Sequence, residues 1–153
     1  MTSPLPGGES IIRCMREALL DAGISPAEID YINAHASGTQ VNDSNEAMCI
    51  HEVFGERARA SSAASGHGSA LPVSGTKAFT AHPLGATGAI ETVICALALE
   101  HDYLPPTLHH RVPDPGCDLD IVPNIGRAAP LRKVMNNAFG FGGINASLIL
   151  GKG

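Results

Sequence analysis

The chain has 153 residues, of which 44% are hydrophobic and 16% charged, which is enough for one globular domain with a buried core. Its 15 acidic and 10 basic residues give a net charge of -5 without a dense basic block, which excludes the footprint needed for nucleic acid or an anionic membrane. We see no secretory signal and expect no apolar run long enough to span a bilayer. The expected protein is therefore cytoplasmic, with small or protein-borne substrates.

Helices and short strands alternate in the first part of the chain. Residues Glu9–Asp21 place apolar side chains at helical spacing, and Ile29–Asn33 alternates as a short strand. Asn42 or Asp43 then caps a second helix. This order predicts that His35 lies just past the end of a strand.

The second part begins with a segment that has no apolar period. Arg57–Leu71 is mostly Ala, Ser and Gly and predicts a flexible surface loop. Pro72–Ser74 follows as a short strand, and Gly85–Glu100 predicts a long apolar helix that is central and buried. Val134–Leu150 predicts two strands joined by Phe139–Gly143, whose glycines permit a backbone path closed to other residues. Backbone atoms of this turn could approach a ligand.

Two histidines stand in compact motifs of small and hydroxyl residues, His35 within Asn33–Thr39 and His82 within Lys77–Gly85. Paired imidazole N–H donors can hold one developing oxyanion. An isolated histidine at a strand end is more often a hydrogen-bonded structural residue, so both interpretations stay open at this point. The remaining histidines have no carboxylate or cysteine at a metal-ligand spacing, and no metal site is predicted for them: His51, His67, His101, His109 and His110.

The order and spacing of the motifs resemble one family, the β-ketoacyl-(acyl-carrier-protein) synthases, which are elongating condensing enzymes of the thiolase-like fold. The motifs are Met1–Pro4, Asp21–Gly23, Asn33–His35, Gly75–Lys77, His82–Glu91, Leu104–Thr107, Cys117–Asp120 and Asn137–Gly143. The resemblance covers only the C-terminal part of such an enzyme. It implies that residues 1–153 form the α/β C-terminal half of the layered αβαβα fold, a mixed sheet packed on helices. The N-terminal domain with the nucleophilic cysteine is expected to be absent.

The resemblance also implies a reaction, the decarboxylative Claisen condensation of malonyl-carrier protein with an acyl thioester in fatty acid biosynthesis. Such enzymes take an acyl group onto cysteine, decarboxylate malonyl and let the resulting enolate attack the acyl thioester. His35 and His82 would donate to the malonyl thioester oxygen, and losing one such donor typically costs about 100- to 1,000-fold. Neither an organic cofactor nor a metal is implied.

Other residues receive supporting roles by the same resemblance. The ammonium of Lys77 would pair with Glu91 and help to orient the malonyl-binding histidine; the alternative is a surface ion pair worth about 0–1 kcal/mol. Phe141 would gate the acyl pocket and supply an amide to an oxyanion hole, or else belong to a glycine hairpin with two core aromatics. Ser37 and Thr39 would offer hydroxyls to the substrate's pantetheine arm.

Two acidic residues and two alanines leave structural questions. Asp43 and Glu46 are structural acids of the family or simply helix-start residues that satisfy orphan amides, and we favour the second interpretation. Ala36 and Ala81 stand where the family usually has glycine. If either needs a positive backbone φ, alanine would be strained by about 1–2 kcal/mol.

No cysteine of the chain suits the role of nucleophile. A reactive thiolate needs an electropositive, partly exposed site. Cys14, Cys49 and Cys95 fall within helical patterns, and Cys117 adjoins Asp118. We therefore expect the chain to be inactive in condensation without the N-terminal half.

Two other functions stay open. The chain could be a non-catalytic partner subunit or truncated remnant of a condensing enzyme, in the manner of chain-length factors, and an uncovered apolar face would mark such an orphan half. A thiolase would carry a second cysteine in a glycine-rich turn, where Phe139–Gly143 stands instead. The expected partners are an acyl carrier protein, the N-terminal half of the synthase and, since family members are usually homodimers, a second copy of the chain.

Overall fold

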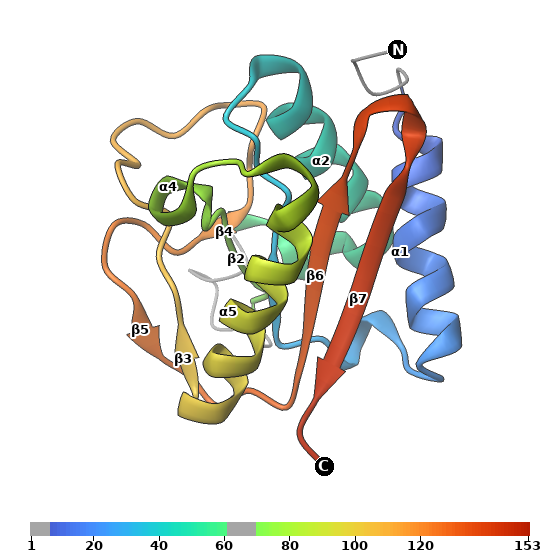
Figure 1. Cartoon of the computed structure of the whole chain (residues 1–153), viewed down its shortest axis with the longest axis vertical. Coiled ribbons are helices and arrows are strands. Elements are labelled where there is room, and N and C mark those ends of the chain that lie inside the picture. The colour runs from blue at the N-terminus through green and yellow to red at the C-terminus, as the bar shows by residue number, and fades with distance from the viewer. Residues whose placement is uncertain (1–6, 61–69) are drawn as a thin grey trace.

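A five-stranded mixed sheet forms the centre of the protein in this computed structural model, which describes residues 7–60 and 70–153 (Figure 1). Strand β1 (Tyr31–Asn33) pairs in parallel with β2 (Pro72–Ser74) on one side and β6 (Lys133–Phe139) on the other. Strand β4 (Asp120–Ile121) continues the sheet in parallel beyond β2, and β7 (Asn145–Gly151) runs antiparallel to β6. The order β4-β2-β1-β6-β7 confirms the predicted α/β fold with a mixed sheet.

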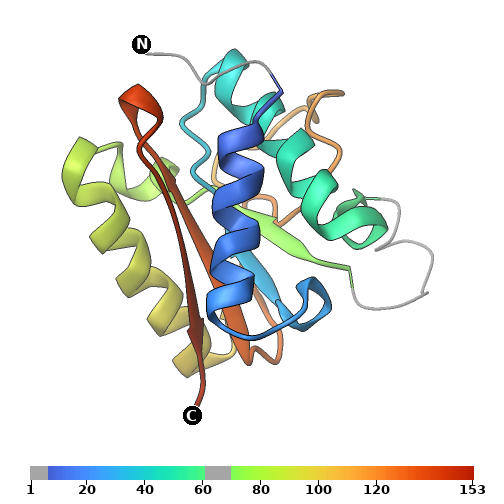
Figure 2. The same ribbon diagram turned by 90° about the vertical axis from the view of Figure 1, so that its right-hand side faces the viewer.

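Helices α1 (Glu9–Asp21) and α2 (Gln40–Phe54) cover one face of this sheet (Figure 2). The predicted bounds of α1 are confirmed. Its buried side chains recur every four residues and pack into the larger apolar core: Ile11, Met15 and Leu19.

The N-terminal cap of α2 differs from the prediction. Thr39 precedes the helix, and its hydroxyl accepts a hydrogen bond from the amide of Asn42 at 3.3 Å. Asn42 and Asp43 lie inside the first turn, so neither is the cap. The Thr39 hydroxyl thereby satisfies one of the first-turn amides that have no partner within the helix.

Helix α5 (Thr87–His101) covers the opposite face, after the short helix α4 (Lys77–Thr80) and the turn η3 (Leu84–Ala86) (Figure 2). One side of α5 packs on the sheet, but its outer side exposes apolar residues: Ile90 at 37%, Val93 at 59% and Leu97 at 47%. The predicted central burial of this helix is therefore wrong for the chain by itself. Among the described residues, it packs mainly on β6 and β7 of the sheet, on β3 (Tyr103–Leu104) and on the turn η3.

The same segment corrects a second expectation. Residues 84–101 are long and apolar enough to cross a bilayer on length and composition alone. The run nevertheless carries Glu91 as a fully buried side chain bonded to Lys77, and α5 packs against β6. These contacts make it a core helix rather than a lipid-facing one.

The predicted flexible loop is packed at both ends. Ala58, in the turn η2 (Gly55–Ala58), and Leu71 are fully buried, and the amide of Leu71 donates to the carbonyl of Arg57 at 2.8 Å. The guanidinium of Arg57 also donates to two backbone carbonyls, those of Pro26 and Ile29. The end residues of the loop are therefore packed, while residues 61–69, with His67, and the Met1–Pro4 motif lie outside the described residues.

The remaining elements connect these layers. The turn η4 (Phe141–Gly143) joins β6 and β7, as predicted, and Gly142 there has a φ of 78° that favours glycine. Strand β3 pairs with β5 (Arg127–Ala128) as a two-residue antiparallel ladder that is too short for a sequence pattern. The turn η1 (Pro26–Glu28) leads into β1.

Candidate active site

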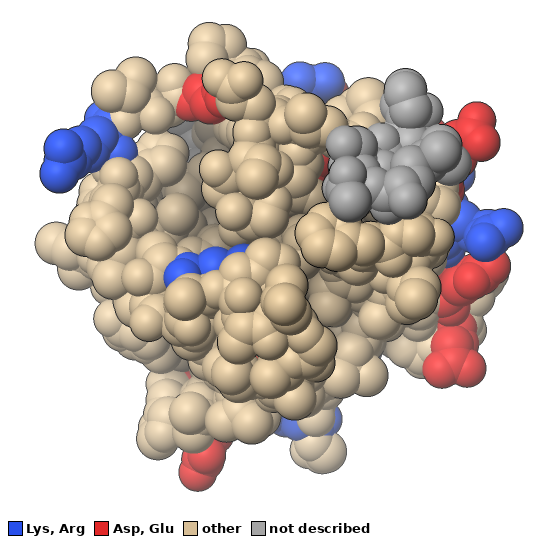
Figure 3. Space-filling model, turned by 45° about the horizontal axis from the view of Figure 1, so that its top comes forward, with Lys and Arg blue, Asp and Glu red and all other residues tan. Residues whose placement is uncertain are grey.

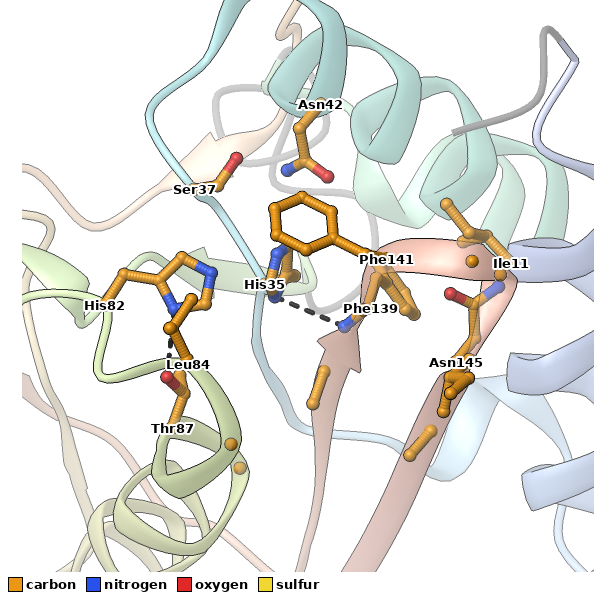
Figure 4. A pocket seen from close by; sticks show the side chains of 18 of the residues that line it. Ile11, His35, Ser37, Asn42, His82, Leu84, Thr87, Phe139, Phe141 and Asn145 are labelled. Carbon is orange, nitrogen blue, oxygen red and sulfur yellow. Dashed lines mark hydrogen bonds between the residues drawn. The ribbon is translucent and has the colours of Figure 1, made fainter. Parts of the chain in front are cut away.

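The carboxyl ends of β1, β2 and β6 meet at one edge of the sheet because the three strands run in parallel. His35, Lys77 and Phe141 follow these three strands in turn, so the topology gathers them from distant parts of the sequence. A cavity of about 740 Å³ opens there. Its lining includes His35, Ser37, Thr39, His82, Leu84, Thr87, Phe139 and Phe141 (Figure 4). On the face shown in Figure 3, charged groups lie mainly toward the edge of the view.

His35 is only 6% exposed and is held at three points. Its amide donates to Oε1 of Glu46 at 2.8 Å, its carbonyl accepts from Nζ of Lys77, and its ring Nδ1 accepts from the amide of Phe139 at 3.2 Å. A neutral imidazole that accepts at Nδ1 carries its proton on Nε2. Burial, followed by the charges of Lys77 and His82, lowers the pKa of His35 from 6.5 to about 4, so the ring is neutral near pH 7.

His82 lies on the opposite wall of the cavity and is exposed. Its ring centroid is 5.3 Å from that of His35, with the two rings nearly perpendicular. Nδ1 of His82 lies 3.0 Å from the hydroxyl of Thr87 (Figure 4). The structure therefore brings together the two histidines that the sequence singled out.

The predicted pair of Lys77 and Glu91 is present and buried. Nζ of Lys77 lies 2.5 Å from Oε1 of Glu91, and the two side chains are 7% and 0% exposed. Burial raises the pKa of Glu91, and the bonded ammonium opposes that rise. The alternative of a surface ion pair is therefore wrong.

Glu46 corrects the interpretation as a helix-start residue. It lies in the second turn of α2 and is buried, and its Oε1 and Oε2 accept the amides of His35 and Ala36, each at 2.8 Å. Burial raises its pKa to about 7 against these hydrogen bonds. Asp43 does lie in the first turn, where it accepts from the amide of Gly38 at 3.1 Å.

The other predicted binding residues line the same cavity. The hydroxyls of Ser37 and Thr39 lie 3.0 Å apart, although Thr39 also caps α2. Phe141 is 66% exposed beside the histidines, whereas Phe139 is 9% exposed and packs 5.7 Å from the ring of His35 (Figure 4). Only one of the two aromatics therefore belongs to the core.

Both alanines that replace the usual glycines have positive φ. Ala36 has a φ of 38°, and Ala81 has φ 58° and ψ -166°, a region that is essentially restricted to glycine. Leu84, on the other side of His82, adds a φ of 48°. The segment that carries His82 is therefore strained on both sides.

No cysteine lies among the described residues that line the cavity. Burial raises the pKa of Cys49 and Cys117 to about 11 and that of Cys95 to about 12. After burial, the largest contribution to the raised pKa of Cys117 is the negative charge of Asp114, not that of the adjacent Asp118. Within the described ranges, no group of three His, Cys, Asp or Glu side chains could hold a metal ion.

Comparison with known proteins places these residues in a family. Residues 1–111 match the family model described as β-ketoacyl synthase, C-terminal domain. The chain belongs to the β-ketoacyl synthase family. It is 46% identical over 152 residues to 3-oxoacyl-[acyl-carrier-protein] synthase 2 of Coxiella burnetii, covering 99% of this chain and 34% of that protein.

Solved structures give the same result for the fold of this synthase domain. The ishigamide ketosynthase/chain length factor superposes with a TM-score of 0.87 at 40% identity, over 99% of this chain and 34% of that one. A type II polyketide ketosynthase in complex with its acyl-carrier protein gives 0.89 at 38% identity, over 100% and 35%. The chain thus spans about a third of the length of its relatives, and the thiolase-like fold is shown.

Two contacts in the synthase domain escaped the sequence analysis. They are the contact of the Thr87 hydroxyl with Nδ1 of His82 and the hydrogen bond from the amide of Phe139 to His35. Thr87 lies only five residues after His82, so a single turn can bring the two side chains together. A hydroxyl residue at that spacing was therefore a sequence signal for this contact. The second joins residues 104 positions apart and has no local signal.

Proposed function

We propose that the chain supplies the two histidines of a condensing active site that decarboxylates malonyl on an acyl carrier protein and joins it to an acyl thioester. The observation that carries this proposal is the juxtaposition of His35 and His82, 5.3 Å apart in one cavity, with Nε2 of His35 left as a donor. Decarboxylation breaks a C–C bond and sends its electron pair toward the thioester oxygen. Two fixed N–H donors at that oxygen would stabilise the enolate.

The neutral state of His35 suits this role. A neutral imidazole donates from Nε2 without adding a proton that the enolate carbon could capture. The carbanion then attacks the carbonyl carbon of the acyl thioester. A new C–C bond forms, and the thiolate of the enzyme cysteine that held the acyl group leaves. Since none of the described residues that line the cavity is a cysteine, we propose that this cysteine comes from outside residues 1–153.

The remaining residues have supporting roles in this proposal. Lys77 would hold the His35 carbonyl, Phe141 would gate the acyl pocket, and Ser37 and Thr39 would contact the pantetheine arm. Lys77 is buried, and Phe141 is 66% exposed. No cofactor takes part in the proposed reaction.

We propose three partners and a location on the same basis. The outer side of α5 exposes three apolar side chains, and relatives of this chain are about three times as long, so an N-terminal synthase half would cover this surface. An acyl carrier protein fits because a ketosynthase of the same fold is recorded in complex with one. A homodimer and a cytoplasmic location remain part of the proposal.

A second candidate is a non-catalytic subunit of the chain-length-factor kind. It is favoured by the similarity to a ketosynthase/chain length factor at a TM-score of 0.87. Such a subunit has no need of a donor pair, so its histidine variants would leave the activity of the assembled enzyme unchanged. The experiment below separates the two candidates.

The test incubates the purified chain with malonyl-carrier protein, with and without an N-terminal synthase half, and measures carbon dioxide and condensed product. We expect no condensation by the chain alone and activity with the added half. His35→Ala and His82→Ala should each lower that activity by about 100- to 1,000-fold.

His101→Ala is the matched control, because His101 is exposed at the far end of α5. It should leave the rate unchanged. Product formed by the chain alone would refute the need for an outside cysteine, and unchanged rates in both cavity histidine variants would refute the donor pair and favour the non-catalytic subunit.

A further inference from the structure

The side chain of Thr87 is nearly inaccessible, at 2% exposure, at the first position of α5. Its hydroxyl lies 3.0 Å from Nδ1 of His82 (Figure 4). Among the residues that the structure describes, no other hydrogen-bond partner of this hydroxyl is found. Thr87 therefore faces one polar atom, and that atom belongs to the exposed histidine of the cavity.

The direction of this hydrogen bond decides which nitrogen of His82 carries the proton. If Nδ1–H donated to the hydroxyl oxygen, the hydroxyl hydrogen would be buried without an acceptor among the described residues, at a cost of about 1–3 kcal/mol. If the hydroxyl donates to Nδ1 instead, both groups are satisfied. The second arrangement is favoured, and it leaves the proton of a neutral ring on Nε2.

His35 reaches the same state by a different route. Its Nδ1 accepts from the backbone amide of Phe139, a donor that only a substitution by proline would remove. His82 has only the side chain of Thr87 in that position. Because threonine is branched at Cβ, its hydroxyl has few rotamers and holds its direction well.

We propose that Thr87 is a positioning residue, whose hydroxyl donates to Nδ1 of His82 and so presents Nε2–H toward His35 and the cavity. The catalytic consequence rests on the proposed function, but the tautomer does not. In the reaction the two rings would then offer one N–H each to the same oxygen.

The test records ¹⁵N NMR spectra of the full chain labelled at histidine, at a pH of about 8, where an unperturbed imidazole of pKa about 6.5 is neutral. In the wild type, we expect the proton of His82 on Nε2 and the Nδ1 resonance at the position of a hydrogen-bonded acceptor. Thr87→Val should move that resonance toward the value of an unbonded nitrogen and introduce the second tautomer. Thr87→Ser, which keeps the hydroxyl, should retain the wild-type spectrum.

Thr92→Val is the matched control, since Thr92 lies on the same helix and its hydroxyl donates to the carbonyl of Gly88 at 2.7 Å. It should leave the resonances of His82 in place. A wild-type proton on Nδ1, or identical spectra for the wild type and Thr87→Val, would overturn the proposal. If Thr87→Val does not fold, a wild-type proton on Nδ1, or a wild-type Nδ1 resonance at the position of an unbonded nitrogen, would still overturn the proposal.

A second measurement links the tautomer to chemistry. With an N-terminal half added, Thr87→Val should lower kcat for malonyl decarboxylation by about 10-fold at unchanged KM, less than the loss of an oxyanion donor itself, and Thr87→Ser should restore it. A wild type with the expected tautomer but no decarboxylation would refute the proposed function and keep the role of Thr87. Decarboxylation with the opposite tautomer would refute the role of Thr87 alone.

Discussion

The two histidines of the cavity are held in contrasting ways. His35 is 6% exposed and its segment is fixed by Glu46, by Lys77 and by the amide of Phe139. His82 is exposed, and within the described part of the chain its ring has one hydrogen bond, to the side chain of Thr87. Two residues beside it, Ala81 and Leu84, have strained φ values. The wall of the cavity that carries His35 is therefore fixed by several hydrogen bonds within this chain, while the wall that carries His82 has fewer of them.

The contrast follows from the layers of the fold. His35 is held from α2, because Glu46 of that helix accepts its amide. Together α1 and α2 cover the face of the sheet that holds the larger apolar core (Figure 2). His82 precedes α5, whose outer side exposes Val93 and Leu97. Covering that side with a partner would restrict α5 and the segment before it. The following predictions test how rigid the first wall is and how strained the second one is.

The largest effect is expected from breaking the buried ion pair under His35. Lys77→Met leaves the carboxylate of Glu91 buried without its cation and the carbonyl of His35 without its donor. Urea unfolding should show a loss of about 3–5 kcal/mol in the free energy of unfolding. The double variant Lys77→Met/Glu91→Leu should recover part of this loss, because no unpaired charge remains.

The exposed pair of Arg13 and Glu17 is the control. Its side chains are 75% and 67% exposed, and Arg13→Met should change the free energy of unfolding by less than about 1 kcal/mol. If Lys77→Met lowered the free energy of unfolding by less than about 1 kcal/mol too, the contacts of Lys77 with Glu91 and with the His35 carbonyl would not make this wall of the cavity rigid.

A somewhat smaller effect is expected when the pH falls. The pKa of His35 is about 4 in the folded chain, below its ordinary 6.5, so the unfolded chain binds a proton first and acidification through this range lowers stability. Glu46 acts in the opposite direction, because its folded pKa of about 7 exceeds its ordinary 4.5 and the folded chain binds that proton first. In the wild type, the two contributions oppose each other.

Glu46→Gln removes the second contribution and leaves the first. Urea unfolding at pH 7 and at about pH 4.5 should therefore show a steeper acid loss in this variant than in the wild type, by about 3 kcal/mol at most. Parallel pH profiles of the two proteins would contradict the opposed titration of His35 and Glu46.

The contrast between the two walls also marks how far the sequence could predict the structure. Local patterns predicted the bounds of α1 and the existence of the strand before His35 and of the hairpin around Phe141, although that strand begins at Tyr31 rather than at Ile29. The interpretation of Glu46 as a helix-start acid was wrong, because its partners are the amides of His35 and Ala36 in the loop that follows β1. The pattern of α2 shows which side of the helix is apolar but not which amides lie opposite it.

The burial of α5 could not be predicted for a different reason. The apolar residues of 85–100 fit a helix covered on both sides, and composition alone cannot tell which cover belongs to the same chain. The two histidines that the family motifs singled out lie in one cavity, yet the donor to His35 comes from Phe139, 104 residues away. Such contacts depend on strand order, which the motifs do not specify.

The smallest expected effect concerns the strain beside His82. Ala81→Gly should raise the free energy of unfolding by about 1–2 kcal/mol, because glycine adopts the φ of 58° and ψ of -166° without a Cβ clash. Ala78→Gly, three residues earlier and exposed within α4, should lower it by about 0.5–1 kcal/mol, since glycine loses more backbone entropy in a helix. Opposite signs in urea unfolding would locate the strain at the residue before His82. Equal signs would mean that the wall of His82 is no more strained than an ordinary helix, and the contrast with His35 would then rest on exposure alone.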